Sequence, residues 1–226
     1  MAFLDGYYNH SNLRMYFYFI LFFLNLALIH CASALMGGFF LLLYIMIPAV
    51  RKIFQKWNFN FFTILSILLC LILVGVSFFF FSSGKAPQWL YDITRQKRSI
   101  MIRLLLWCGI TKEIIIQPIF GYGLGEDAAF FARPDTSLTY NAHNAYLQTL
   151  HEGGIFTLGA VFAVLALFAH KLKTCQDRKL AGFFAVIVFS DLIMMQSAIT
   201  SWFTWYPILI IVQIASLVCT EQEVME

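Results

Sequence analysis

Residues 61–81 read FFTILSILLCLILVGVSFFFF, an uninterrupted apolar run without a charged side chain. A helix needs about 20 mostly apolar residues to cross a bilayer, so this stretch predicts a membrane span. The whole chain of 226 residues has the same character, because 61% of its residues are hydrophobic and only 12% are charged. About a quarter of the residues of a soluble domain are charged. The composition therefore indicates an integral membrane protein and excludes a soluble enzyme, a disordered chain and a secreted disulfide scaffold.

Five further apolar runs have the length expected of spanning helices. Together the predicted spans cover about 15–32, 35–50, 61–81, 155–170, 180–198 and 202–218. We therefore expect an all-α, polytopic transmembrane helical bundle of about six spans. It divides into three spans in residues 1–81, a large extracytoplasmic loop with amphipathic helices in residues 82–152, and three spans with an acidic tail in residues 153–226.

Lysine and arginine in the short loops set the expected orientation, because short basic loops stay in the cytoplasm. Two such loops, at residues 51–56 and 171–179, fall on the same side of a six-span bundle. The loop 82–152 is then extracytoplasmic. It carries seven of the 15 basic residues, namely Lys85, Arg95, Lys97, Arg98, Arg103, Lys112 and Arg133. This charge suggests an anionic ligand, although contact with lipid headgroups accounts for it equally well.

Helical periodicity predicts how this loop is organised. Residues 99–117 have an apolar face at helical spacing, and within them Arg103 lies one turn before Trp107. Pro118 ends this helix, and the glycine-rich stretch 120–125 follows. Its spacing does not fit a dinucleotide-binding fingerprint, so we interpret it as a turn that bends sharply or packs closely. A second helix is expected to begin near Asn141 and to stop at Gly153.

His143 is the candidate general base of this loop. A neutral imidazole accepts a proton from a hydroxyl group near pH 7, and the start of a helix disfavours the imidazolium form. An isolated histidine is more often structural than catalytic. This one shares its loop with several arginines, a glycine-rich turn and the carboxylate of Glu152, and that combination favours a catalytic role.

Four arginines are candidate anion ligands, because guanidinium matches phosphate with two parallel hydrogen bonds. They are Arg95, Arg98, Arg103 and Arg133. Arg103 is notable because its charge lies within an apolar amphipathic helix. Either it binds an anion, or its side chain reaches past the apolar face to the lipid headgroups.

Polar residues also occur inside the predicted spans. Asp191 falls in the fifth span, where an ionisable group is a functional hypothesis. Asn25, His30 and Gln196 predict hydrogen bonds between helices. The five cysteines, Cys31, Cys70, Cys108, Cys175 and Cys219, contain no CxxC pair and predict small buried side chains. No histidine has metal-ligand spacing, and we expect neither a metal nor a cofactor.

Three motifs follow one another along this part of the chain. They read Arg103-x-x-x-Trp107, Pro118-x-x-Gly121-x-Gly123-x-Gly125 and His143-Asn144-x-Tyr146-Leu147-x-x-Leu150-x-Glu152-x-Gly154. In this order they resemble the O-antigen ligase and O-antigen polymerase superfamily, over about residues 24–182. Two features differ from the family, since Ala34 stands where it usually has arginine and fewer spans are expected. The chain therefore resembles a short or N-terminally truncated member.

The resemblance implies a metal-independent, inverting glycosyltransferase of cell-surface polysaccharide synthesis in the bacterial plasma (inner) membrane, with a periplasmic active-site loop. Such an enzyme transfers a glycan from an undecaprenyl diphosphate carrier to an acceptor hydroxyl. The acceptor is lipid A-core for a ligase of lipopolysaccharide biosynthesis, and the growing glycan for a repeat-unit polymerase. The implied partners are these two substrates and membrane lipids, without a cofactor or nucleic acid.

The same resemblance implies roles for the loop residues. His143 is the expected base that deprotonates the acceptor hydroxyl. The expected substrate-binding residues are Arg103, Arg98, Arg95, Asn144, Glu152, Gly121 and Gly123. The arginines would hold the diphosphate, while Asn144 and Glu152 would either position the helix of His143 or contact sugar hydroxyls.

Two other kinds of function remain open from the sequence. A transporter or channel would use Asp191 and the other intramembrane polar residues to line a path, but it predicts internal repeats, and none is visible. An inactive remnant of the family would act only as a membrane scaffold.

Overall fold

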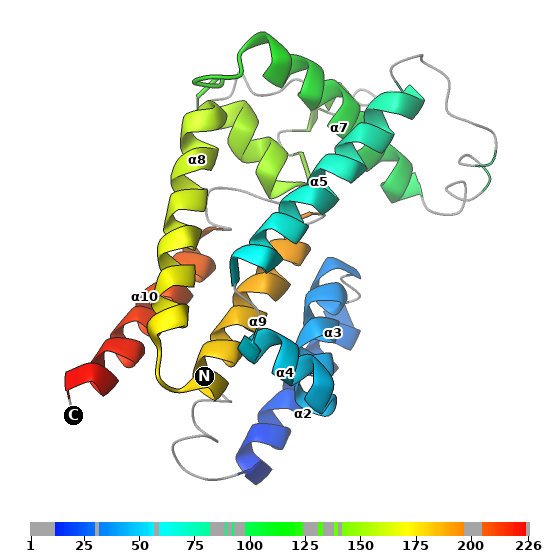
Figure 1. Cartoon of the computed structure of the whole chain (residues 1–226). Helices are drawn as coiled ribbons and strands as arrows, with labels where there is room; N and C mark the ends of the chain where they lie inside the picture. Colours follow the sequence, from blue (N-terminus) through cyan, green and yellow to red (C-terminus); the bar gives the residue numbers. More distant parts are fainter. Residues whose placement is uncertain are drawn as a thin grey trace.

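The computed structural model describes residues 12–29, 32–56, 59–81, 89, 92, 98–123, 131–132, 138–139, 142–196 and 205–224 (Figure 1). Its helices are α2 (Asn12–Ile29), α3 (Ala32–Met46), α4 (Pro48–Lys56), α5 (Phe59–Phe81), α7 (Arg98–Ile116), α8 (Ala145–Thr174), α9 (Arg178–Met194) and α10 (Trp205–Val224). Two short antiparallel strands, β1 (Phe131–Ala132) and β2 (Leu138–Thr139), pair in the long loop. The predicted all-α class is therefore confirmed.

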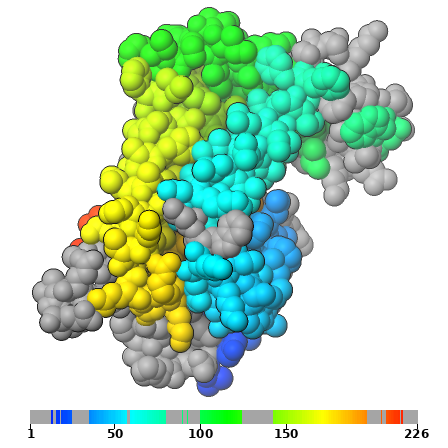
Figure 2. Space-filling model, in the orientation of Figure 1, coloured from blue at the N-terminus to red at the C-terminus, as the bar shows by residue number. Residues whose placement is uncertain are grey.

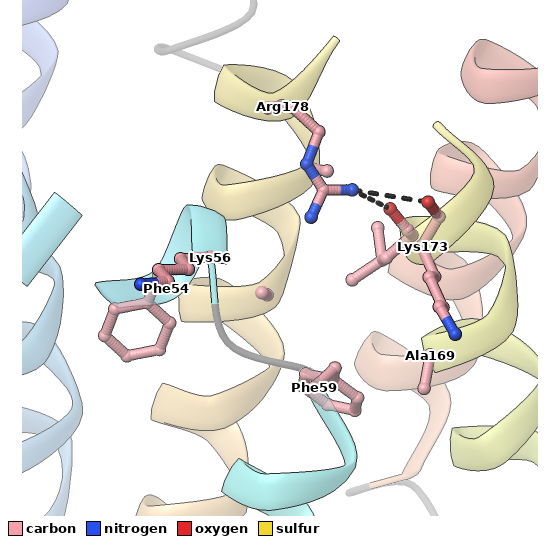
Figure 3. Close-up of a pocket in the computed structure, with 9 residues that line it drawn as sticks. Phe54, Lys56, Phe59, Ala169, Lys173 and Arg178 are labelled. Atoms are coloured by element: carbon pink, nitrogen blue, oxygen red, sulfur yellow. Dashed lines mark hydrogen bonds between the residues drawn. The ribbon is translucent and has the colours of Figure 1, made fainter. Parts of the chain in front are cut away.

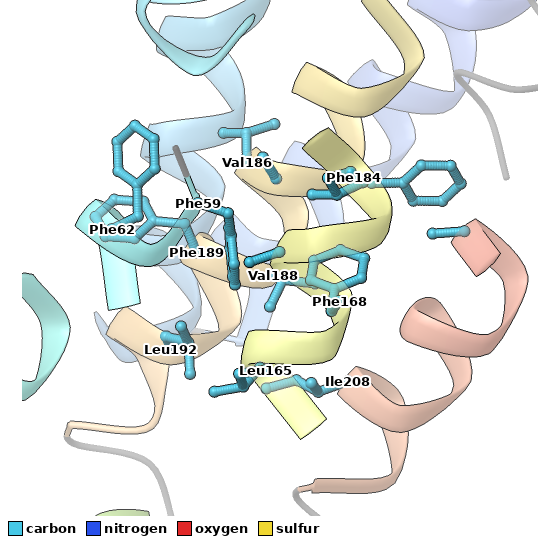
Figure 4. Packing of buried hydrophobic residues seen from close by; sticks show 14 of the residues in the cluster. Phe59, Phe62, Leu165, Phe168, Phe184, Val186, Val188, Phe189, Leu192 and Ile208 are labelled. Carbon is cyan, nitrogen blue, oxygen red and sulfur yellow. The ribbon is translucent and has the colours of Figure 1, made fainter. Parts of the chain in front are cut away.

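Helix α9 lies at the centre of the bundle. It contacts α3, α4, α5, α8 and α10, and nearly all its side chains from Leu180 to Ile193 are buried. A helix that is apolar on every side is stable only when other apolar groups surround it. Aromatic rings from neighbouring helices supply them, among them Phe59 of α5 and Phe168 of α8 (Figure 4). Phe189 also packs edge-on against Phe40 of α3, with ring centroids 5.2 Å apart.

Two helices in the described part of the chain are long and apolar enough to cross a membrane. They are Phe59–Phe79 of α5 and Ala145–Thr174, and the bent pair Leu35–Met46 and Pro48–Lys56 makes a third if it is one span. Figure 2 shows α5 and α8 along one face, with the end of α7 and the turn after it above them. The predicted membrane character is confirmed, whereas the six-span count and the extracytoplasmic placement of the loop are not confirmed.

The predicted second span, 35–50, is broken at its end. Helix α3 stops at Met46 and α4 starts at Pro48, and the two segments are bent by 101°. Proline lacks a backbone donor and is accommodated best in the first turn of a helix. Arg51 supports the bend, because its Nη2 donates to the carbonyl oxygen of Ile45 at 2.7 Å and so satisfies a terminal carbonyl of α3.

The helices of the long loop begin and end close to the residues predicted from the helical spacing of apolar side chains. Helix α7 covers Arg98–Ile116, against the prediction of 99–117. The helix expected from near Asn141 begins at Ala145, and the predicted break occurs at Gly154, whose φ of 63° and ψ of −167° are non-helical. Figure 1 shows the part of α8 before Gly154 turned away from the axis of the rest.

The prediction for the cysteines is confirmed where the structure describes their side chains. Cys70, Cys108 and Cys175 are buried and free. The side chains of Cys31 and Cys219 lie outside the described residues.

Candidate active site

The residues before α8, Ala142 to Asn144, form a short segment that we call the strap. The indole Nε1 of Trp107 on α7 donates to the carbonyl oxygen of Ala142 at 2.9 Å. The backbone nitrogen of Ala142 donates to Oε1 of Gln148 on α8 at 2.8 Å. Ala142 is fully buried. The backbone nitrogen and oxygen of Ala142 are therefore both hydrogen-bonded, the oxygen to a side chain of α7 and the nitrogen to a side chain of α8.

Asn144 fixes the other end of the strap. Its Oδ1 accepts hydrogen bonds from the backbone nitrogens of Tyr146 at 3.0 Å and Leu147 at 3.2 Å, which makes it the N-cap of α8. Its Nδ2 donates to the carbonyl oxygen of Gln196 at 3.2 Å, and the side chain has no exposed surface. Of the two roles predicted for Asn144, this geometry suits positioning of the helix rather than contact with a sugar.

His143 lies between these two fixed residues in an unusual backbone conformation. Its φ of 51° makes it the sole non-glycine residue with a positive φ in the described part of the chain. The left-handed region costs roughly 1–2 kcal/mol for a residue with a side chain. Such strain persists where the surroundings over-determine it, and it is concentrated at functional sites. The residue is half-buried and Nδ1 of its imidazole is enclosed, so contact with a substrate would fall to the rest of the ring.

The turn after α7, which we call the glycine turn (residues 118–123), packs against the break in α8. The backbone nitrogens of Tyr122 and Gly123 each donate at 2.8 Å to the carbonyl oxygens of His151 and Glu152. A Cβ on Gly121, whose φ is +66°, would lie 2.5 Å from the oxygen of His151. The interpretation of the stretch 120–125 as a sharp, closely packed turn is therefore confirmed up to Gly123, and residues 124 and 125 lie outside the described residues.

We expect Gly154→Ala to destabilise the protein strongly. Gly154 lies in a region of φ and ψ that only glycine adopts readily, and a Cβ there would lie 2.1 Å from the carbonyl oxygen of Ile119. The expected loss is at least about 2 kcal/mol, measured as thermal unfolding of the purified protein in detergent. Gly159→Ala is the matched control, because a Cβ at Gly159 meets nothing within 4 Å. Equal melting temperatures for the two variants would contradict this account of the break.

Two polar side chains of α8, those of Gln148 and Glu152, are connected to the strap by hydrogen bonds. The Nε2 of Gln148 donates to a carboxylate oxygen of Glu152, so Gln148 links that carboxylate to the backbone of Ala142. Glu152 is therefore connected to the strap through one buried amide. The four-residue spacing of Gln148 and Glu152 places them on one helix face, a signal in the sequence that could have identified Gln148.

Tyr122 extends the contacts of the glycine turn. Its ring stacks on that of His151 with centroids 4.8 Å apart. Its hydroxyl donates to a carboxylate oxygen of Glu113 at 3.2 Å. Burial and the Glu113 carboxylate raise the pKa of the Tyr122 hydroxyl, so it stays a donor at neutral pH. The three residues join α7, the glycine turn and α8, and none was predicted as part of the site.

Arg103 is the one predicted arginine whose side chain lies within the described residues. It is half-buried on α7, one turn before Trp107, and residues at this spacing are neighbours. Since Trp107 bonds to the strap, Arg103 is brought to the same end of the bundle as His143. The side chain of Arg98, the first residue of α7, lies outside the described residues, as do Arg95 and Arg133.

The polar residues predicted inside the spans differ in outcome. Nε2 of Gln196 donates to the backbone oxygen and the hydroxyl of Ser66 at 3.0 and 3.2 Å, so its predicted link between helices is confirmed. Asp191 is half-buried in the last part of α9. The side chains of Asn25 and His30 are outside the described residues. Within the described residues no group of three or more His, Cys, Asp and Glu could hold a metal ion.

One comparison with known proteins gives a match. Residues 17–162 match the model of the family described as O-antigen ligase. The matched segment includes α7, the glycine turn, the strap and the first part of α8. No curated protein and no solved structure matches the chain.

Proposed function

The chain belongs to the O-antigen ligase family of membrane glycosyltransferases, and from this premise we propose that it transfers a glycan from an undecaprenyl diphosphate carrier to an acceptor hydroxyl. The observation that carries the proposal is the strap. It holds the half-buried His143 in a strained conformation, and the helix that carries Arg103 is bonded to it through Trp107. A base and a cation are thereby supported by one rigid frame.

In the proposed reaction His143 acts as the general base. Its imidazole takes the proton of the acceptor hydroxyl, and the resulting nucleophilic oxygen attacks the anomeric carbon of the glycan. The bond from that carbon to the diphosphate oxygen breaks, and the carrier diphosphate leaves with the electron pair. Attack from the face opposite the leaving group inverts the configuration.

The proposed role of Arg103 is to stabilise the leaving diphosphate. Negative charge grows on the bridging oxygen as the bond breaks, and a positioned guanidinium lowers the energy of that state. Arg98 and Arg95 are proposed to contribute further cations. Asn144 and Glu152 are proposed to position the strap, the former as the N-cap of α8 and the latter through Gln148.

Ligase and polymerase share this donor chemistry and differ in the acceptor. We propose lipid A-core as the acceptor, with transfer on the periplasmic side of the inner membrane. Transfer to a growing glycan by a repeat-unit polymerase is the second candidate.

Complementation in bacteria tests the proposed function. The full chain is expressed in one strain that lacks its O-antigen ligase and in another that lacks its polymerase, and the lipopolysaccharide ladder is read on a gel. We expect capped chains to return in the ligase-deficient strain. Return of long chains only in the polymerase-deficient strain would indicate a polymerase. Rescue of neither strain by a correctly inserted protein would contradict glycan transfer in these hosts and favour a remnant.

A further inference from the structure

Helix α4 is a short amphipathic helix set across the end of the apolar segment before it. It turns by 101° from the segment Leu35–Met46. Its three basic residues, Arg51, Lys52 and Lys56, are exposed, whereas its Phe54 is buried. A short helix with a basic face and an apolar face, set across a spanning helix, lies in the plane of the interface. Groups beside α4 are therefore expected at the depth of the lipid headgroups.

A cavity of about 150 Å³ lies beside the end of α4, between α4, α5, α8 and α9 (Figure 3). One water needs only about 10–15 Å³ of such space, so a larger group fits. The inner wall is apolar and is made by Phe54, Phe59, Ala169, Leu172, Ala181 and Ala185. The remaining lining residues are cations, Lys56, Lys173 and Arg178.

Arg178 is held in place at this cavity. Its Nη1 donates to the carbonyl oxygens of Leu172 at 3.2 Å and Lys173 at 3.3 Å. Its Nη2 donates to the carbonyl oxygen of Gln55 at 2.9 Å. The guanidinium thus joins the last turns of α8 and α4, and these neutral acceptors leave it charged.

The charged residues that line the cavity are all basic. None of the lining residues is acidic. Asp177, the nearest acidic residue in sequence, caps α9, and its Oδ1 accepts from the backbone nitrogens of Lys179 at 2.9 Å and Leu180 at 3.2 Å. With three basic and six apolar lining residues, the cavity has a composition that suits an anion carrying apolar groups.

We propose that this cavity binds the phosphate of an anionic phospholipid headgroup. Basic pockets between membrane helices bind such headgroups, and the apolar inner wall and the depth set by α4 favour a lipid over a soluble phosphate. The site is separate from the strap. From Gly154 to Lys173 helix α8 rises roughly 28 Å at about 1.5 Å per residue, close to the hydrocarbon thickness of a bilayer. The lipid therefore binds at the interface opposite the candidate active site.

The test measures the melting temperature of the purified full chain in neutral detergent, by its tryptophan fluorescence, as phosphatidylglycerol or phosphatidylcholine is added. We expect phosphatidylglycerol to raise the melting temperature at concentrations at least tenfold below those of phosphatidylcholine. In the double variant Lys56→Gln/Lys173→Gln the apparent affinity for phosphatidylglycerol should fall by roughly 30-fold, because each lysine near a membrane surface contributes attraction. Neither lysine side chain has a hydrogen bond to maintain among the described residues.

The matched control is Lys52→Gln/Lys171→Gln, which removes the same charge from the same two helices outside the cavity. It should retain the affinity of the wild type to within about threefold, because a charge outside the cavity does not touch the bound phosphate and is screened by water and salt. Equal losses in the two double variants would overturn the proposal in favour of general surface charge. An equal rise in melting temperature with inorganic phosphate would overturn the lipid as the ligand.

If the first double variant is not monodisperse, the single variants Lys56→Gln and Lys173→Gln replace it. Each is expected to lose about fivefold in affinity for phosphatidylglycerol, and unchanged affinity in both would overturn the proposal.

Discussion

His143→Ala is expected to lower the rate of glycan transfer by about 10²–10⁴-fold while the protein remains folded and inserted. A general base contributes about this factor, and alanine cannot accept the proton of the acceptor hydroxyl. The structure gives a reason to expect a stable variant. The strap is held by backbone groups of Ala142 and by the side chain of Asn144, so removal of the imidazole leaves those bonds in place.

The measurement is transfer of a labelled glycan from its lipid diphosphate carrier by the purified variant, with the melting temperature as the check on folding. His170→Ala is the control, because His170 is an exposed histidine on α8, the helix that follows the strap, and its activity should equal that of the wild type. Wild-type transfer by His143→Ala would remove the imidazole from the mechanism and leave His143 as a structural residue.

Local patterns were sufficient to predict the helices of the long loop. The boundaries of α7 were predicted to within a residue, because its apolar spacing and Pro118 act within the segment itself. The break in α8 was predicted at Gly153 and lies at Gly154, because a pair of glycines is a strong local signal. Both features depend on a few consecutive residues.

The number of spans depends on contacts between residues of the folded chain, and the hydropathy of the sequence does not predict those contacts. The apolar run 35–50 reads as one span, yet it ends at Met46 because Pro48 and Arg51 stabilise a sharp bend there. The apolar character of α9 also reads as lipid exposure, although protein buries most of that helix. Apolar residues alone do not distinguish a lipid neighbour from a protein neighbour.

The strap could not be predicted for a similar reason. Its partners are distant in sequence, since Trp107 lies 35 residues from Ala142 and Gln196 lies 52 residues from Asn144. The left-handed conformation of His143 follows from those contacts and not from its own preference. The close packing of Gly121 and Gly154 likewise involves two glycines whose proximity only the fold reveals. The sequence therefore predicted candidate residues for the site, while the contacts between the segments that carry them required the structure.

Arg103→Lys is expected to lower glycan transfer by about 10²-fold, the second large effect in the active site. Loss of one positioned donor to a developing negative charge costs a factor of about 10²–10³. Lysine keeps the charge but cannot form the two parallel hydrogen bonds of a guanidinium with phosphate. If Arg103 served only to reach the headgroups, lysine would replace it fully, because both side chains do this.

Transfer rates distinguish diphosphate binding by Arg103 from contact with the lipid headgroups. They are measured with the lipid diphosphate donor at a saturating concentration of acceptor. Lys112→Gln is the control, since it removes an exposed cation from the same helix, and it should change the rate by less than about threefold. Arg103→Gln should be at least as slow as Arg103→Lys if the guanidinium binds the diphosphate. A rate for Arg103→Lys equal to that of the wild type, with a loss only in Arg103→Gln, would show that charge suffices at this position. The half-buried guanidinium would then be a membrane anchor of α7, and the cations that stabilise the leaving diphosphate would have to come from elsewhere in the loop.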